Sequence, residues 1–317
     1  MLSHNQISRR SFFQATTTVA VGGIATRFAA AQPPAAPMLT QFQIACMTLV
    51  YSSFPFDRAL TGLQSAGFRF VAWGTTHQEA GDQRVPVIAP DAPVERAREL
   101  ARRCRDRGLE PIMMFSGVMP EAENHLDVMR ARTRQASAAG IPQLLTFGNT
   151  RGGDRPRWIE HFRQLGPIAR DAGVTIVLKP HGGLTARGAM AADIVREIAD
   201  ANVKVNYDAG NVMDYLHIPA ADVLADAGRC AGEVRSFCIK DHRQQPRDED
   251  CGPGLGDIDH YRLLQPLAFT GRPMPLACEN ISAPLLPRPT RPEGIDALAR
   301  RAREYLELVV QGIQTRP

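Results

Sequence analysis

Lysine is scarce in this chain. Of its 37 basic residues only three are lysines, Lys179, Lys204 and Lys240, and the others are arginines. A lysine kept in an arginine background offers a compact charge whose pKa responds to burial, which arginine does not supply. Lys179 stands in "IVLKPHGG", where a buried apolar run turns into a loop. The position predicts a chemical role for its amine, and chance placement is the alternative.

Other features are absent, and each absence excludes a class of protein. No uninterrupted apolar run reaches the roughly 18 to 20 residues that a membrane span needs. The six cysteines are scattered and contain no C-x-x-C pair, so neither a zinc knuckle nor a disulfide framework is predicted. No G-x-G-x-x-G occurs, which argues against a dinucleotide-binding sheet.

The N-terminus has the layout of a cleaved export signal. "SRRSFF" places an arginine pair before a weakly apolar stretch that ends in Ala-x-Ala at Ala31. We therefore predict a twin-arginine signal at residues 1–31, a linker at residues 32–40 and one folded domain at residues 41–317. An amphipathic N-terminal helix is the alternative. The signal predicts a periplasmic protein that has no membrane association after cleavage.

Removal of this signal leaves the chain nearly neutral. Residues 1–31 contain three arginines and no acid, so the net charge of +4 falls to +1, with 34 basic and 33 acidic residues remaining. The chain also lacks a run of lysine or arginine, and nucleic-acid binding is therefore not expected.

Short apolar runs alternate with longer segments of helical period from residue 43 onward. Most runs are continuously apolar, as in parallel strands that are covered on both faces. The predicted strands are residues 43–49, 68–73, 109–115, 142–147, 174–179, 203–208, 233–240 and 274–279. Three of the intervening helices stop at a glycine just before the next strand. Eight such units predict an α/β fold, a single (β/α)8 TIM barrel, with a doubly wound open sheet as the alternative.

Chemically capable residues gather at the carboxyl ends of these strands, where barrel enzymes hold their active sites. The candidates are His77, Lys179, His181, Asp208, Asn211, Lys240, Asp241, His242 and Glu279. Carboxylates and imidazoles on one face suit a divalent metal or general acid–base catalysis. Each also has a structural interpretation: Asp208 alone is a good N-cap for the next helix, and a single loop histidine is more often structural.

Several motifs resemble one family. They are "AGFRFVAW" after the first helix, "DAGN" at strand 6, "IKD" at strand 7, "GPGLGDID" at residues 252–259 and "CEN" at strand 8. With them the chain resembles the xylose isomerase-like TIM barrels, a superfamily of sugar isomerases, sugar epimerases and endonuclease IV-type enzymes. The resemblance covers essentially all of residues 43–311.

The resemblance implies one divalent metal held by acids of strands 5 and 6, a histidine of strand 7 and a glutamate of strand 8. Two of these roles fall on Asp208 and Glu279. The strand-5 acid falls on Lys179, which repels a metal, and the strand-7 histidine falls on Cys238. We expect His242 or His181 to supply nitrogen to a manganese, magnesium or zinc ion, and a Cys238 thiolate would favour zinc. The alternative is that no metal binds.

The resemblance also implies proton abstraction beside a carbonyl. We assign catalysis to Lys179, Glu279 and His181, with Lys179 either a neutral base or a protonated group that polarises the substrate oxygen. Substrate binding is assigned to His77, Asn211, Lys240 and Asp241, and metal binding to Asp208, Glu279 and His242. The prediction is an exported isomerase or epimerase that acts on a non-phosphorylated carbohydrate, since sugar phosphates are cytoplasmic.

Alternatives remain open at this level. A β-eliminating lyase on keto-glycosides shares the enolate chemistry, and a carbohydrate-binding barrel without catalysis would explain the two lost ligands. A nuclease of the endonuclease IV type needs many more metal ligands than this face offers. The expected partner is a small carbohydrate, and a homo-oligomer is possible.

Overall fold

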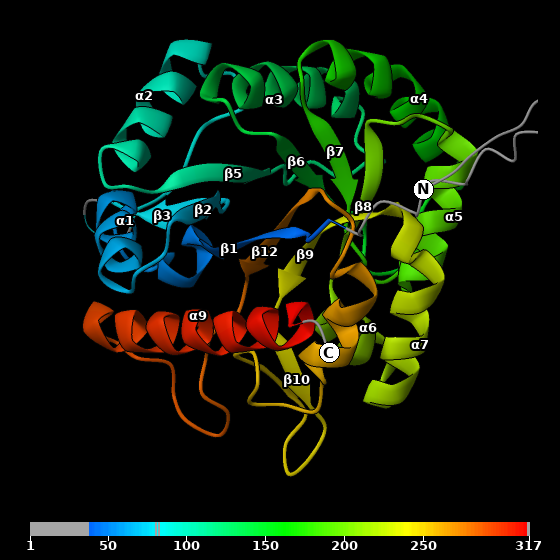
Figure 1. The fold of residues 1–317 in the computed structure, drawn as a ribbon. Coiled ribbons are helices and arrows are strands. Elements are labelled where there is room, and N and C mark those ends of the chain that lie inside the picture. The colour runs from blue at the N-terminus through cyan, green and yellow to red at the C-terminus, as the bar shows by residue number, and fades with distance from the viewer. Residues whose placement is uncertain (1–37, 80, 82, 316–317) are drawn as a thin grey trace, which may run out of the picture. The chain divides into compact units, whose positions relative to one another are not determined.

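Eight parallel strands form a closed barrel in this computed structural model, which describes residues 38–79, 81 and 83–315 (Figure 1). Around the ring the order is β1-β12-β9-β8-β7-β6-β5-β2. The strands are β1 (Gln41–Met47), β2 (Phe70–Trp73), β5 (Glu110–Phe115), β6 (Gln143–Thr146), β7 (Thr175–Leu178), β8 (Val203–Tyr207), β9 (Val234–Ile239) and β12 (Pro273–Cys278). Each of the eight predicted strands overlaps one of these, so the predicted (β/α)8 barrel is confirmed and the open sheet is excluded.

Helices cover the outside of the barrel (Figure 1). They are α1 (Phe56–Ser65), α2 (Val94–Arg105), α3 (His125–Ala139), α4 (Arg155–Asp171), α5 (Gly188–Ile198), α6 (Ala209–Leu216), α7 (Ala220–Cys230), α8 (His260–Leu264) and α9 (Pro292–Gln314). Three 3-10 turns add Thr48–Tyr51, Ala231–Glu233 and Gln265–Leu267. No described helix is both long and apolar enough to cross a membrane.

The core has two layers, because successive side chains of a strand point to opposite faces. In β1, Ala45 and Met47 belong to a small inner cluster that also holds Val177, Cys238 and Ala277. Cys46 belongs instead to the large cluster between strands and helices. All six cysteines are buried and free. The barrel interior is therefore packed with side chains up to its carboxyl end, where polar residues replace them.

Three features were not predicted. The segment between β8 and β9 contains two helices, α6 and α7, where one was expected. Two short antiparallel hairpins follow barrel strands, β3 (Thr76–Gln78) with β4 (Arg84–Pro86), and β10 (Asp241–Arg243) with β11 (Glu249–Cys251). Both hairpins lie at the carboxyl ends of barrel strands, β2 and β9, where they carry residues that the sequence left in loops.

The predicted export signal at residues 1–31 and most of the predicted linker at residues 32–40 lie outside the described residues. The described residues from Met38 onward belong to one compact unit, which contains the barrel.

Candidate active site

Strand periodicity carries four charged side chains into the barrel mouth. Val177, Cys238 and Ala277 face the interior, and the residues two positions later are Lys179, Lys240 and Glu279. Asp208 follows β8 in the same way. Cations and anions from four different strands therefore meet above the apolar interior.

Lys179 is bound by carboxylates from two other strands. Its Nζ donates to both Oε1 and Oε2 of Glu279 at 2.7 Å and lies 3.2 Å from Oδ2 of Asp208. The rings of Phe115 and Phe147 lie beside the ammonium, with centroids 5.7 and 5.8 Å from Nζ. The Lys179 side chain is only 3% exposed, so it forms a buried ion pair and not a surface contact.

Burial by itself would lower the pKa of Lys179, but Glu279 and the other acidic groups around it outweigh that effect and raise the pKa. The amine is therefore an ammonium at any physiological pH. Of the two roles that the sequence left open, this environment favours the charged group that polarises an oxygen.

The pKa values of the two carboxyls, Asp208 and Glu279, are shifted in opposite directions. Burial raises the pKa of Asp208 to about 7, in spite of the neighbouring lysines. Burial acts on Glu279 in the same sense, but Lys179 and Lys240 overcome it and bring the pKa of Glu279 to about 2. Glu279 is thus the ionised member, and Asp208 holds a proton more readily.

Asp208 also has the structural role that the sequence suggested. Its Oδ1 accepts the backbone N–H of Asn211 at 2.9 Å and so caps the N-terminus of α6. The Asn211 side chain is buried, donates to the carbonyl of Pro180 at 2.8 Å and accepts from Nζ of Lys240 at 2.5 Å. Asn211 therefore holds Lys240 and the loop after β7 in place.

His181 stands at the edge of the same mouth. Its Nδ1 lies 2.9 Å from the carbonyl of Gly148, which can only accept, so Nδ1 carries the proton and Nε2 the lone pair when the ring is neutral. Burial lowers the pKa of His181. The ring packs against Phe147 and Tyr215, with centroids 4.5 and 5.5 Å away. It is a neutral base in an aromatic wall.

His242 is held outside this centre, in an acidic cluster. Its Nδ1 lies 3.0 Å from Oδ1 of Asp250, and its Nε2 lies 2.7 Å from Oδ1 of Asp248. Burial would lower the pKa of His242, but the bond to Asp250 raises it. The structure thus does not bring His242 into the group formed by Asp208 and Glu279.

Two further candidates have structural partners. Asp241 is fully buried and accepts the backbone N–H groups of His242, Gly254 and Ile258 at 2.9, 2.9 and 3.0 Å. His77 is 1% exposed, and its Nδ1 pairs with the carbonyl of Phe54 at 2.9 Å. The assignment of these two residues to substrate binding stays a prediction.

A cavity of about 620 Å³ opens beside Glu279 and Lys240. Its wall includes hydroxyl and amide side chains of Ser52, Ser53, Asn280, Ser282 and Thr290, together with apolar side chains. Glu279 is 15% exposed, whereas Lys179 behind it is almost fully enclosed. A small polar molecule in this cavity would therefore meet Glu279 first.

Comparison with known proteins identifies the family. The family model described as the xylose isomerase-like TIM barrel matches residues 60–305, most of the chain. The chain is a xylose isomerase-like TIM barrel. No curated protein has a sequence significantly similar to this xylose isomerase-like barrel.

Solved structures agree on the fold. A xylose isomerase-like TIM barrel protein from Mycobacterium smegmatis, in complex with magnesium, has 16% identity and a TM-score of 0.66 over 88% of this chain and 98% of that one. D-psicose 3-epimerase with D-tagatose from Clostridium cellulolyticum H10 has 12% identity and a TM-score of 0.62 over 84% and 99%. A probable 3-DHS dehydratase from Bacillus anthracis has 11% identity and a TM-score of 0.61 over 84% and 98%.

Two groups of described residues bring potential metal ligands within 4.8 Å of one another. They are Asp208, Cys238 and Glu279, and Asp214, His242 and Asp248. In the first group the Lys179 ammonium already contacts both carboxylates, and burial raises the pKa of the Cys238 thiol well above its usual range. A cation and a neutral thiol do not fit the family's metal. In the second group, His242 already pairs with Asp248 and also with Asp250, which lies outside the group, and Asp250 raises the pKa of His242.

Sequence reasoning missed three residues of this xylose isomerase-like barrel. Asp250 pairs with both Lys240 and His242, because β11 places it opposite His242 in the hairpin. Phe115 and Phe147 flank the Lys179 ammonium. The run "RDEDCG" signalled an acidic segment for Asp250. No local signal distinguished the two phenylalanines from core residues.

Proposed function

We propose that this chain is an isomerase- or epimerase-like enzyme that moves a proton at the carbon next to a carbonyl of a small, non-phosphorylated carbohydrate. The observation that carries the proposal is the buried Lys179 ammonium, bound to Glu279 and Asp208 at the barrel mouth and beside the cavity of about 620 Å³. Family membership and the hydroxyl-lined wall of that cavity support a carbohydrate substrate.

Lys179 supplies the positive charge of the reaction. When a substrate carbonyl enters, its oxygen accepts a hydrogen bond from Nζ and competes with Glu279 for that donor. As the proton leaves the neighbouring carbon, the C–H electron pair moves toward this oxygen, and the ammonium stabilises the resulting enediolate. The charge is already in place within the protein, so no step needs a metal.

Glu279 accepts the proton from carbon. Its pKa of about 2 makes it a weak base while both oxygens accept from Lys179. Diversion of Lys179 to the substrate oxygen weakens this ion pair and raises the basicity of Glu279 at the moment when it is needed. The Nε2 lone pair of His181 is the second candidate to carry a proton, and return of the proton to carbon completes isomerisation or epimerisation.

Solvent exchange tests the proposal. The purified protein is incubated with unphosphorylated keto-sugars, including D-fructose and D-tagatose, in deuterated buffer, and deuterium at carbon is measured by NMR. We expect Glu279→Gln to lower the exchange rate about 10² to 10⁴-fold and Lys179→Met to lower it about 10² to 10³-fold. Lys204→Met is the matched control, because Lys204 pairs with Glu233, one of the acids away from the mouth.

The same experiment has outcomes that contradict the proposal. Release of an aglycone from a keto-glycoside, without exchange into recovered sugar, would identify a lyase. Sugar binding without exchange or product would identify a binding protein. Treatment with a chelator should leave the rate of deuterium exchange within about twofold of that of the untreated protein. A chelator-dependent loss that manganese restores would refute the role given to Lys179.

A further inference from the structure

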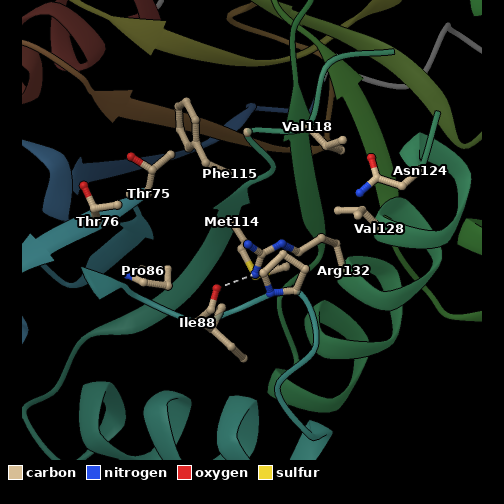
Figure 2. Close-up of a pocket in the computed structure, with 13 residues that line it drawn as sticks. Thr75, Thr76, Pro86, Ile88, Met114, Phe115, Val118, Asn124, Val128 and Arg132 are labelled. Carbon is tan, nitrogen blue, oxygen red and sulfur yellow. Dashed lines mark hydrogen bonds between the residues drawn. The ribbon is translucent and has the colours of Figure 1, made fainter. Parts of the chain in front are cut away.

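A second cavity, of about 340 Å³, lies at the carboxyl ends of β2 and β5 (Figure 2). It is lined mainly by apolar side chains, with Thr75, Thr76, Asn124 and Arg132 as the polar exceptions. Phe115 also lines it, and the ring of Phe115 lies 5.7 Å from the Lys179 ammonium. This cavity therefore adjoins the active site but is distinct from the one that Glu279 lines.

Arg132 is a buried cation that has no carboxylate partner among the described residues. It is only 8% exposed, and Figure 2 shows it reaching from α3 to the backbone of Ile88. Its Nη1 donates to the carbonyl of Ile88 at 2.7 Å and to Oε1 of Gln135 at 3.1 Å. Its Nε is buried and has no partner, and no carboxylate in residues 38–79, 81 and 83–315 pairs with the guanidinium.

The other buried cations of this chain are arranged differently. Lys179 contacts Glu279 and Asp208, and Lys240 contacts Asp250 at 2.7 Å. Transfer of an unpaired charge into a protein interior costs several kcal/mol even after relaxation. The missing anion at Arg132 is therefore a specific feature of this cavity.

We propose that the cavity binds the carboxylate of a small organic acid, with Arg132 as its counter-ion. The Nε and Nη2 edge of a guanidinium matches the two oxygens of a carboxylate. In Arg132 the hydrogen bonds to Ile88 and Gln135 both come from Nη1, and Nε has no partner. Thr75, Thr76 and Asn124 add hydrogen-bonding groups, while the apolar wall accepts the body of the acid. One guanidinium balances a monoanion and leaves a phosphate dianion only half neutralised.

Arg132 also has a structural contact that the experiment must separate from binding. Arg132 and Gln135 together hold the carbonyls of Ile88, Ala89 and Ala92 in the loop before α2. A purely structural Arg132 would matter for stability and not for ligand affinity.

Calorimetric titration in carboxylate-free buffer separates these roles. The probes are propionate against propionamide, and D-glucuronate against D-glucose, which differ in the carboxylate. We expect the wild-type protein to bind each acid at least about tenfold more tightly than its neutral partner. The neutral ligand has no carboxylate and cannot form the charge-assisted bidentate pair with Arg132. Arg132→Gln should abolish this preference, and Arg132→Lys should retain part of it.

Arg235→Gln is the matched control, because Arg235 likewise donates to backbone carbonyls, those of Gly232 and Val234, but lies at the start of β9. It should bind propionate like the wild type. If Arg132→Gln does not fold, the affinities of the wild-type protein for propionate and propionamide still show whether the cavity prefers a carboxylate. Equal binding of the two, or tighter binding of inorganic phosphate, overturns the proposal.

The two sources of the carboxylate give different results. Glucuronate bound more tightly than propionate indicates an acidic sugar, whereas equal affinities indicate a free organic acid. Both results support the site. Because titration measures binding and not turnover, and because Glu279→Gln should still prefer propionate to propionamide, failure of this proposal is distinguishable from failure of the proposed function.

Discussion

The three lysines show how one residue type serves different roles at the scale of single side chains. Lys204 lies on β8 and pairs with Glu233 where both side chains are partly exposed, at 17% and 20%. Lys179 and Lys240 are enclosed, and each has a carboxylate 2.7 Å away. Enclosed pairs are fixed in place, and removal of one partner leaves an uncompensated buried charge. We therefore propose that the chemistry lies with the two enclosed lysines.

Lys179→Met should lower the free energy of unfolding by about 3 to 5 kcal/mol at neutral pH, because Glu279 and Asp208 then lose the one cation that contacts both of them and keep only the more distant charge of Lys240. Lys204→Met should cost about 1 kcal/mol or less. Urea unfolding followed by circular dichroism measures both. Equal losses for the two variants would contradict the buried ion pair.

The pH dependence of the Lys179→Met effect follows from the two carboxyls. Glu279 has its pKa lowered from 4.5 to about 2, so its contribution to stability is present above pH 4.5 and is lost as pH falls through about 2. Asp208 has its pKa raised from 3.8 to about 7, so its contribution is complete below 3.8 and is lost as pH rises through 7. Without Lys179 both carboxyls bind protons more readily. The loss in Lys179→Met should therefore be largest near neutral pH and shrink below about pH 4.5.

At the scale of elements, the hairpin of β10 and β11 and the loop after it determine the far side of the site. The pairing of His242 with Asp250 in the hairpin brings Asp250 to both His242 and Lys240. Asp241 fixes the loop 252–258 through the backbone N–H groups of Gly254 and Ile258. At Gly256 a Cβ would lie 2.4 Å from Oδ1 of Asp241, so the loop can pack this closely only with glycine there.

Asp241→Ala should loosen this loop. Three buried backbone N–H groups lose their acceptor, and we expect a loss of about 3 kcal/mol with faster hydrogen exchange in residues 252–258. Asp259→Ala is the control, since Asp259 caps α8 by accepting one N–H, from Arg262 at 3.1 Å, and its loss should cost about 1 kcal/mol. Hydrogen exchange read by mass spectrometry compares the two. Unchanged exchange in Asp241→Ala would show that Asp241 does not hold the loop.

At the scale of the whole molecule, ring closure joins the ends of the chain. β1 pairs with β12 in parallel, with Cys46 opposite Cys278. α9 then packs against α1 and β1, and Asp296 of α9 accepts from Tyr51 at 2.8 Å and from Arg58. Acids and bases that are distant in sequence can meet at one mouth only because the sheet closes.

Export is a prediction for the chain as a whole and concerns residues outside those described. We propose that the arginine pair Arg9 and Arg10 directs the chain to the periplasm by the twin-arginine route. Replacement of both by lysine should leave most of the protein in the cytoplasm of a bacterial host. Arg27→Lys in the same segment should not change its distribution. Fractionation with immunoblotting measures this, and equal periplasmic amounts of the two variants would refute the route.

Local sequence patterns were enough to predict the eight βα units. Continuous apolar runs marked the strands, and the glycines at 67, 108 and 140 have the positive φ values that end a helix before a strand. The ends of these apolar runs then placed Lys179, Asp208, Lys240 and Glu279 at the carboxyl ends of strands. These are local properties, which short stretches of chain specify.

Which of these residues meet depends on how the barrel closes. Lys179 and Glu279 are separated by 100 positions, and their ion pair depends on the stagger of strands around a closed ring. The same holds for the place of His242 among aspartates, and for Arg132, which the fold buries away from every described carboxylate. Burial and the sum of surrounding charges set the protonation of such groups, and both quantities belong to the assembled barrel.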